Sequence, residues 1–486
     1  MAKRKSAPTF FLLSLAILSC TTSLAVDASS QQEAQLSKFM ASRVGPLPGR
    51  CKPTPPSGSK EDDRIAGGLP GQPPGVDFAQ YAGYVTLDEE RGRELFYYLV
   101  ESPEDAASKP LILWLTGGPG CSSLSYGAMM ELGPFRVNPD GETLSRNEYA
   151  WNNLANVMFL DSPAGVGFSV SKAEADFKTV HDGNTADDTY KFLVRWLERF
   201  PEYKGREFYV TGESYGGHYV PQLAAVIALM NRRIAAHQTP INLRGIFLGN
   251  PLLDNGLFKK GYMEYLWNHG VISDEAWDHI VSEGSFEIPE EYKYSVGDHT
   301  IGGTTVDSFD IYAPVCLQSR NNGTYYSSSL LPGYDPCSEH YVHAYLNIPE
   351  VQKALHARRG TWTACIPNLT RIDSPAFMVP TVRYLVDIGL RVWIFSGDFD
   401  AICSLTVTRY SVKDLNLDVT KKWRPWYAPN GEVGGYVQQY QGGFTLASVR
   451  AAGHMVPASQ PERSLALLDA FLNNVLPPAD MPQLND

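Results

Sequence analysis

The chain has 486 residues, of which 43% are hydrophobic and 19% are charged, as is usual for a folded protein with a large core. This composition excludes a disordered chain, a collagen and a coiled coil. The 53 acidic residues outnumber the 41 basic ones, giving a net charge of -12. No stripe of Lys and Arg could follow a phosphate backbone, so nucleic acid is not an expected partner.

The N-terminus has the features of a secretory signal peptide. Basic residues at positions 3–5 precede an apolar run, and the small residues Ser23 and Ala25 follow it. We therefore predict a signal peptide over residues 1–25 and a route through the secretory pathway to an extracellular or vacuolar location. No later stretch has about 18 uninterrupted apolar residues, so no membrane span is predicted.

The next part of the chain separates a flexible region from a folded core. Residues 26–62 are rich in Ser, Gln, Pro, Gly and Lys without apolar periodicity, as in a flexible region or propeptide. Beyond them, continuous apolar runs typical of buried strands alternate with helical patterns, which predicts an α/β sheet covered on both faces. The predicted strands are 95–100, 111–115, 157–160, 208–210, 245–248, 392–395 and 444–449.

Residues 251–390 interrupt this alternation. A Trp- and Tyr-rich helical stretch is followed by clusters of Gly, Ser, Asn and Tyr. We interpret this range as a lid inserted between two parts of one α/β core, 63–250 and 391–478. Within the lid, residues near 318–331 resemble an exposed loop in which proteolytic cleavage would be tolerated.

A nucleophile motif directly follows the predicted strand 208–210. Residues 212–216 read Gly-Glu-Ser-Tyr-Gly, and a helical pattern begins at once. In a G-x-S-x-G turn, small residues flank a sharp strand-to-helix bend that exposes the serine hydroxyl. A structural serine in a Gly-rich turn is the alternative, but the strand before and the helix after favour Ser214 as a nucleophile.

A serine hydroxyl needs a base and an orienting acid, which in hydrolases of this type follow in the order Ser, Asp, His. Asp398 and Asp400 follow the predicted strand 392–395, and His454 follows the last strand. We choose Asp400, because the acid usually lies three residues past the glycine of such a loop, and Asp398 is the alternative. The surface-loop alternative for His454 is disfavoured because all three elements occur in order.

The tetrahedral intermediate of acyl transfer needs backbone N–H donors. One is expected from Tyr215, directly after the nucleophile. The other is expected from the Gly-rich loop after the predicted strand 111–115, and we assign it to Gly118. A tight turn without a ligand is the alternative for this loop.

Together these motifs resemble the serine carboxypeptidases. The matching segments are WLTGGPGCSS at 114–123, WNNLANVMFLDSPAGVGFS at 151–169, TGESYGGHYVP at 211–221, SGDFDAIC at 396–403 and AAGHMVP at 451–457. The resemblance extends over roughly residues 63–476. It is greatest to plant members of cereal type, in which the lid loop is cut to give two disulfide-linked chains.

The resemblance implies an α/β-hydrolase fold with a mostly parallel central sheet flanked by helices and an inserted helical lid. It also implies removal of C-terminal residues from peptides, with peptide or protein C-termini as partners and a homodimer as an option. The substrate carboxylate would be held by Thr116, Gly117, Glu131 and Glu213. Thr116 replaces the Asn of the family, and acyltransferases on this fold often carry Thr or Ser there. An acyltransferase using an activated ester is therefore the alternative, although those enzymes tend to have Asp where this chain has Glu213.

The cysteines are also assigned by resemblance. It implies the disulfides Cys121–Cys365 and Cys316–Cys337, the second across the cuttable loop, while a third lid disulfide of plant members is absent. Cys403 resembles a free thiol that some members place beside the active site, with a buried inert thiol as the alternative.

Two further features concern modification and cofactors. Asn322 and Asn368 begin sequons and are predicted glycosylation sites. Neither an H-E-x-x-H motif nor a P-loop occurs, so no metal or other cofactor is predicted.

Overall fold

The computed structural model describes residues 58–173, 176, 179–234, 238–286, 306–319, 323–327, 334–367, 369–371 and 374–481. The predicted signal peptide and both sequon asparagines, Asn322 and Asn368, lie outside the described residues. Of the predicted flexible region 26–62, the part from residue 58 onward is described. It contains a turn in which the Ser59 N–H donates to the Asp62 carboxylate at 2.9 Å.

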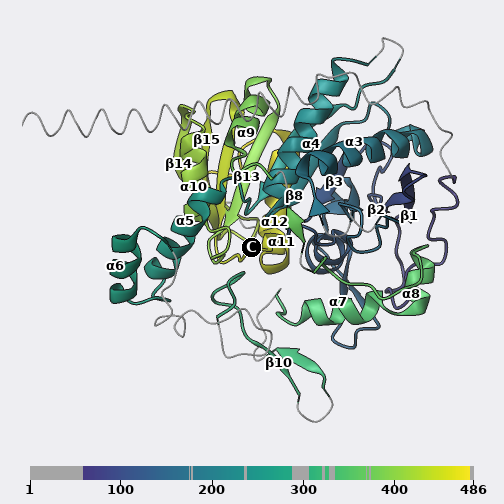
Figure 1. Ribbon diagram of the computed structural model, residues 1–486, viewed down its shortest axis with the longest axis horizontal. Helices are drawn as coiled ribbons and strands as arrows, with labels where there is room; N and C mark the ends of the chain where they lie inside the picture. The colour runs from purple at the N-terminus through teal and green to yellow at the C-terminus, as the bar shows by residue number, and fades with distance from the viewer. Residues whose placement is uncertain are drawn as a thin grey trace, which may run out of the picture. The chain divides into compact units, whose positions relative to one another are not determined.

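A ten-stranded sheet runs through the described chain in the order β1-β2-β6-β3-β8-β9-β13-β16-β15-β14 (Figure 1). Strands from β6 to β16 in this order run parallel to their neighbours. The pairs at the two edges are antiparallel. The strands are β1 (Gln80–Asp88), β2 (Arg93–Val100), β3 (Leu111–Leu115), β6 (Asn156–Leu160), β8 (Phe208–Glu213), β9 (Leu243–Gly249), β13 (Arg391–Gly397), β14 (Val419–Tyr427), β15 (Val433–Tyr440) and β16 (Thr445–Val449).

Helices cover both faces of this sheet, which explains why inner strands such as β3 and β6 are buried along their whole length. Successive side chains of β2 point to opposite faces. Tyr97 packs against Trp196 of α3 (Asp182–Arg199), with ring centroids 6.2 Å apart. Tyr98 belongs instead to the core cluster that contains Phe471 of α12 (Pro461–Asn473). The mostly parallel sheet between helical layers confirms the predicted α/β-hydrolase fold.

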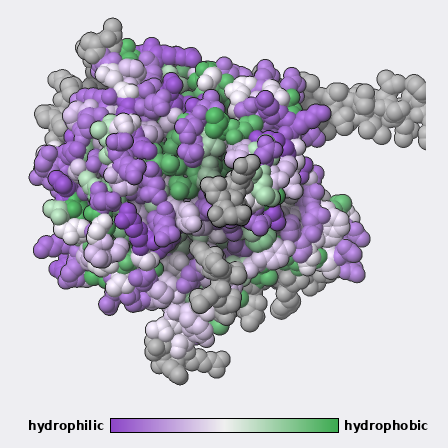
Figure 2. Space-filling model, turned by 180° about the vertical axis from the view of Figure 1, so that it is seen from behind, coloured by the Kyte–Doolittle hydropathy of each residue, from purple (hydrophilic) through white to green (hydrophobic). Residues whose placement is uncertain are grey.

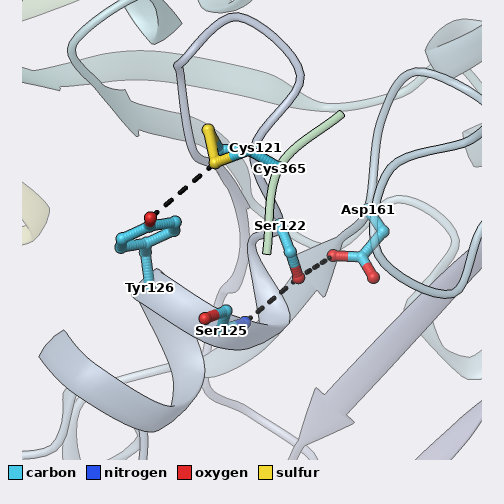
Figure 3. The surroundings of a disulfide bond; sticks show 6 residues. All are labelled: Cys121, Ser122, Ser125, Tyr126, Asp161 and Cys365. Atoms are coloured by element: carbon cyan, nitrogen blue, oxygen red, sulfur yellow. Dashed lines mark hydrogen bonds between the residues drawn. A yellow bond between two sulfur atoms is a disulfide. The ribbon is translucent and has the colours of Figure 1, made fainter. Parts of the chain in front are cut away.

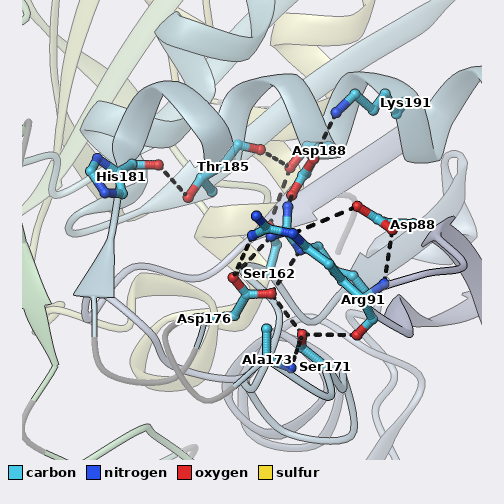
Figure 4. Close-up of polar contacts among 12 residues, drawn as sticks. Asp88, Arg91, Ser162, Ser171, Ala173, Asp176, His181, Thr185, Asp188 and Lys191 are labelled. Carbon is cyan, nitrogen blue, oxygen red and sulfur yellow. Dashed lines mark hydrogen bonds and ion pairs between the residues drawn. The ribbon is translucent and has the colours of Figure 1, made fainter.

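Polar contacts fasten α3 to the edge of the sheet (Figure 4). The Arg93 guanidinium pairs with Asp188 of α3 at 2.7 Å and with Asp176 of the preceding segment at 2.9 Å. The Ser171 hydroxyl also donates to Asp176, at 2.6 Å. These contacts fix the start of α3, which carries Asp182 toward the nucleophile turn described below.

The elements between β9 and β13 fall within the predicted lid range. They are α5 (Asn255–Asn268), α6 (Asp274–Glu283), β10 (Cys316–Gln318), β11 (Tyr325–Ser327), α7 (Ser338–Leu346), α8 (Pro349–Ala354), β12 (Thr370–Arg371) and α9 (Val379–Asp387). In Figure 1, α6, α7, α8 and the β10 hairpin lie below the sheet. α9 differs from them, because it contacts β13 and the core helix α4 (Gly216–Asn231).

The described residues at the predicted cuttable loop include a two-stranded hairpin. β10 pairs antiparallel with β11, with Gln318 opposite Tyr325. The Tyr325 ring stacks on His340 of α7, with centroids 3.5 Å apart. The disulfide between Cys316 and Cys337 draws the hairpin and α7 together.

Shorter elements complete the described chain. They are η1 (Leu124–Glu131), β4 (Phe135–Val137), β5 (Leu144–Arg146), η2 (Trp151–Asn153), β7 (Thr179–Val180), η3 (Pro201–Tyr203), α10 (Leu405–Asp414), η5 (Gln441–Gly443) and α11 (Val456–Ser459). The face seen in Figure 2 is mostly hydrophilic, with hydrophobic residues gathered near its upper centre. No helix in the described ranges is long and apolar enough to cross a bilayer.

Candidate active site

Ser214 lies in a strained turn between β8 and α4. Its φ of 60° is unusual for a residue with a side chain. A Cβ on Gly212 or Gly216 would come too close to the Leu115 carbonyl oxygen at the end of β3. The two glycines of the motif are therefore required by close packing against the neighbouring strand, and the turn presents Ser214 to a cavity.

His454 and Asp400 lie together beneath this cavity. The His454 Nδ1 and the Asp400 Oδ2 are 2.7 Å apart, and both residues are buried. Ser214 and His454 both line the cavity, whose volume is about 370 Å³. The structure thus brings the predicted nucleophile, base and acid to one place, at the carboxyl ends of β8, β13 and β16.

Asp398, the alternative acid, is hydrogen-bonded to groups other than the His454 imidazole. Its Oδ1 accepts a hydrogen bond from the Ala451 N–H at 2.7 Å, and its main-chain carbonyl accepts one from the Tyr265 hydroxyl at 2.7 Å. The first bond connects the loop after β13 to the loop after β16, and the second connects the loop after β13 to α5. Asp398 therefore braces the loops that carry Asp400 and His454, while Asp400 contacts the imidazole.

Asn250 is a residue of the site that the sequence analysis missed. Its amide N–H donates to Asp400 Oδ2 at 2.7 Å, and its Oδ1 accepts from the Gly397 N–H at 3.2 Å. The Ile402 N–H donates to the other oxygen of Asp400 at 2.8 Å. The sequence could have indicated Asn250 because it directly follows β9. Residues that follow neighbouring parallel strands lie at the same edge of the sheet.

The Gly-rich loop after β3 lies against the nucleophile turn. A Cβ on Gly117 would overlap the main-chain nitrogen of Tyr215. Gly118 has a φ of 102° and lines the cavity. The loop and the Tyr215 amide therefore meet at the cavity wall, where the oxyanion donors were predicted.

The side chain of Tyr215 anchors the turn from the other side. Its hydroxyl donates to Asp182 Oδ2 at 2.9 Å and contacts the Ser374 hydroxyl. Its ring stacks on His218, with centroids 4.3 Å apart. These contacts hold in place Tyr215, the residue whose N–H is a predicted oxyanion donor.

Glu131 and Glu213 form a buried pair of carboxyl groups near the nucleophile. Glu131 is 0% exposed and Glu213 is 2% exposed. Burial raises the pKa of Glu131 to about 7. Burial and the neighbouring Glu131 raise the pKa of Glu213 well above its usual value. Since two adjacent buried carboxylates repel each other, the pair retains a proton in mildly acidic solution.

Thr116, which the resemblance places at the substrate carboxylate, lies directly after β3. Its Oγ1 accepts a hydrogen bond from the Trp114 indole N–H at 2.8 Å, and its main-chain N–H donates to Ser123 Oγ at 3.0 Å. Thr116 lines the same cavity as Ser214 and Glu213. Because its oxygen is already an acceptor, its hydroxyl hydrogen can be offered to a substrate group in the cavity.

The segment after the Gly-rich loop is held by a disulfide and a buried carboxylate (Figure 3). Cys121 is bonded to Cys365. The Ser122 hydroxyl donates to Asp161 at 2.7 Å and accepts from the Ser125 N–H at 3.1 Å. Burial raises the pKa of Asp161 to about 6. This support fixes the path of the chain between the Gly-rich loop and Glu131.

The structure also contains the second disulfide suggested by the resemblance, Cys316–Cys337. Cys403 is a free, buried cysteine, and its N–H donates to Asp400 at 3.2 Å. Burial, followed by the nearby Asp400, raises the pKa of the Cys403 thiol well above its usual value. The thiol thus lies beside the site in its neutral form.

The cavity wall carries acidic side chains and, among the described residues that line it, no Lys or Arg. Besides Glu213, they include Asp307, Asp335 and Glu339. In the described part of the chain, no group of three or more His, Cys, Asp or Glu side chains could hold a metal ion.

The sheet, the nucleophile turn and the His454–Asp400 pair define an α/β-hydrolase. The family model of the serine carboxypeptidases matches residues 70–474. The chain belongs to the serine carboxypeptidase family and is an enzyme of that hydrolase type.

Known relatives agree with this assignment. Serine carboxypeptidase-like 28 of Arabidopsis thaliana is 47% identical, covering 85% of this chain and 91% of the relative. Serine carboxypeptidase 24 of the same plant is 44% identical, covering 86% and 93%. A prohormone-processing carboxypeptidase of Saccharomyces cerevisiae, KEX1(DELTA)P, shares the fold with a TM-score of 0.68 and 23% identity, covering 86% of this chain and 97% of that structure.

Proposed function

We propose that the protein removes C-terminal residues from peptides through a covalent acyl-enzyme. Ser214 attacks the scissile carbonyl while His454 takes its proton and passes it to the leaving amine. Asp400 orients the imidazole through the 2.7 Å contact with Nδ1. Water then attacks the ester, with His454 again as the base.

The negative charge of the tetrahedral intermediate is held by main-chain donors. The N–H groups of Gly118 and Tyr215 serve this role, supported by the contact between the Gly-rich loop and the nucleophile turn. The hydrogen bonds of the Tyr215 side chain keep its amide in place before the substrate arrives. Such fixed donors stabilise charge without reorganising during the reaction.

The observation that carries the peptidase proposal is the buried Glu131–Glu213 pair near Ser214. A carboxyl pair that retains a proton can donate a hydrogen bond to a free C-terminal carboxylate, whereas two ionised groups would repel it. Thr116 adds a hydroxyl donor. Gly117 is assigned to carboxylate binding by the family resemblance, and its lack of a Cβ lets the Gly-rich loop lie against the main chain of Glu213 and Tyr215. The site therefore favours substrates that end in a free carboxylate.

The alternative is an acyltransferase that uses an activated ester. Thr116 favours this reading, because a hydroxyl reaches less far than the Asn amide of the family and offers no amide N–H. The same triad chemistry would form the acyl-enzyme, and an acceptor alcohol would replace water. Glu213 favours the peptidase, because the acyltransferases tend to have Asp at this position.

We also propose how the chain is divided and where the protein acts. Residues 63–250 and 391–478 form the hydrolase core and 251–390 the lid, with cleavage near 318–331. The protein passes through the secretory pathway to an extracellular or vacuolar location, where disulfides such as Cys121–Cys365 persist.

One experiment separates the two activities. The purified protein is incubated with a blocked dipeptide, and separately with a glucose ester plus an acceptor alcohol. Release of the C-terminal amino acid without ester transfer supports the peptidase. Transfer of the acyl group without peptide hydrolysis overturns the proposal in favour of the acyltransferase.

A further inference from the structure

A short segment of the lid range passes between the two loops that carry His454 and Asp400. This segment, Ser308–Ile311, is here called the clamp. The Ser308 carbonyl accepts hydrogen bonds from the Ala401 N–H at 3.0 Å and the Ile402 N–H at 3.3 Å. The Ile311 N–H donates to the Phe399 carbonyl at 3.1 Å. The clamp is thus bonded on both sides of Asp400.

The next residue of the clamp holds the other loop. The Phe309 carbonyl accepts a hydrogen bond from the His454 N–H at 2.6 Å. The Phe309 ring packs against the imidazole, with centroids 4.9 Å apart. A Cβ on Gly453 would lie 2.5 Å from the Phe309 carbonyl oxygen and 2.7 Å from Asp310 Cβ. The clamp therefore lies directly on the main chain of the His454 loop.

The geometry of the acid–base pair depends on how these two loops sit relative to each other. Asp400 and His454 follow the parallel neighbours β13 and β16, but both lie beyond the last paired residues, Gly397 and Val449. Main-chain carbonyls of consecutive residues, Ser308 and Phe309, bind one loop each. These carbonyls belong to two successive planar peptide units that meet at the Phe309 Cα, so the backbone conformation of Phe309 helps to set the distance between the loops.

We propose that the clamp is a positioning element for the His454–Asp400 pair, with Phe309 as its positioning residue. The inference rests on the proposed triad and extends it. The lid would then complete the acid–base pair of the core in addition to covering the cavity. The clamp acts through His454 and takes no proton itself.

Gly453→Ala tests the proposal with the smallest possible change. Gly453 does not have a positive φ, so alanine suits its backbone, and the added methyl group must push the clamp away from the loop. We expect kcat to fall by about 100-fold, the size of effect that a misplacement of about 1 Å can have. KM should change by less than about twofold. Gly360→Ala is the matched control, because a Cβ at Gly360 meets nothing within 4 Å.

Two further measurements separate positioning from loss of the fold and from substrate contact. Phe309 lines the cavity, so Phe309→Ala and Phe309→Leu are compared by kcat and KM separately. Positioning predicts a lower kcat for Ala and partial recovery for Leu. The downfield proton resonance of His454 Nδ1 should shift or broaden in Gly453→Ala and Phe309→Ala but not in Gly360→Ala.

The outcomes are distinct. An unchanged kcat and resonance in folded Gly453→Ala and Phe309→Ala would overturn the clamp proposal. If Gly453→Ala does not fold, the comparison of kcat in Phe309→Ala and Phe309→Leu tests the proposal, and an unchanged kcat in both overturns it. A change confined to KM in the Phe309 variants would make Phe309 a substrate-binding residue instead. A wild-type protein that fails to react with a serine-directed phosphonate would refute the proposed triad itself.

Discussion

His454 and Asp400 are in contact through a 2.7 Å hydrogen bond, whereas Asp398 is bonded to the main chain of Ala451. Asp400 also accepts the Asn250 amide at 2.7 Å. Two aspartates separated by one residue therefore have different surroundings. One faces the imidazole, and the other connects two loops.

This difference predicts an order of effects for amide substitutions. Asp400→Asn should lower kcat by about 10⁴-fold, because an amide cannot hold the imidazole in the required tautomer. Asp398→Asn should be milder, because the amide oxygen can still accept the Ala451 N–H. Steady-state kinetics of both variants give the ranking, and a larger loss for Asp398→Asn would show that the wrong carboxylate was assigned.

Ser214→Ala should remove nearly all turnover, with a loss on the order of a millionfold. The fold should persist, because Ser214 lies in a turn and its small side chain faces the cavity. Turnover and thermal unfolding measured on the same preparation separate these effects. Substantial residual hydrolysis in the folded variant would exclude Ser214 as the nucleophile.

The disulfide Cys316–Cys337 encloses the predicted cleavage region. Protein cut between these cysteines should run as one species on a non-reducing gel and as two after reduction. The disulfide Cys121–Cys365 also links the two cut chains, because Cys121 precedes the cut and Cys365 follows it. The test therefore uses a Cys121→Ser background, in which the cut protein should still run as one species without reductant, and separation there would contradict the role of Cys316–Cys337. Adding Cys316→Ser to this background gives the control that should separate without reductant.

Much of the site could be predicted from the sequence because its motifs describe local geometry. The G-x-S-x-G turn requires glycines where Gly212 and Gly216 approach Leu115. The motif therefore predicted the strand before it, the exposed serine and the helix after it. The disulfide partners came from family resemblance. No local pattern links Cys121 with Cys365, which are 244 residues apart.

Other features depend on contacts that no local pattern encodes. Asn250 meets Asp400 only because β9 and β13 are neighbours in the sheet. In the sequence, Phe309 belongs to an irregular segment of the predicted lid, and nothing near it in the chain predicts its contact with His454. The pairing of β10 with β11 likewise arises in a stretch whose composition resembles a loop.

The buried Glu131–Glu213 pair should make stability depend on pH. Burial raises the pKa of Glu131 from 4.5 to about 7, which corresponds to on the order of 3 kcal/mol. The folded protein binds this proton more tightly than the unfolded chain does. The resulting stabilisation is complete below the pKa of the carboxyl group in the unfolded chain, and it is lost as the pH rises through its pKa in the folded protein. The free energy of unfolding should therefore fall between about pH 4.5 and 7. Glu131→Gln should show a flatter profile in denaturant unfolding, and identical profiles would contradict the shared proton.

The same proton should govern substrate binding. A C-terminal carboxylate placed near Glu131 and Glu213 adds a third negative charge once the pair has ionised. Below the raised pKa of the pair, the retained proton can bridge to the substrate. Above it, the charges repel, so KM for a peptide with a free C-terminus should rise from about pH 5 to 8. A peptide amide carries no such charge, and its KM should rise less.

The comparison of acid and amide substrates isolates carboxylate recognition from the chemical step. His454 must be neutral to act as a base, so kcat should not share the preference for acidic solution. Glu131→Gln supplies a group that cannot ionise, and in this variant KM for the free acid should depend less on pH than in the wild type. Equal pH dependence of KM for the acid and amide substrates in the wild type would show that Glu131 and Glu213 do not bind the substrate carboxylate. That result would favour the acyltransferase, because the buried pair would then have no peptide terminus to recognise.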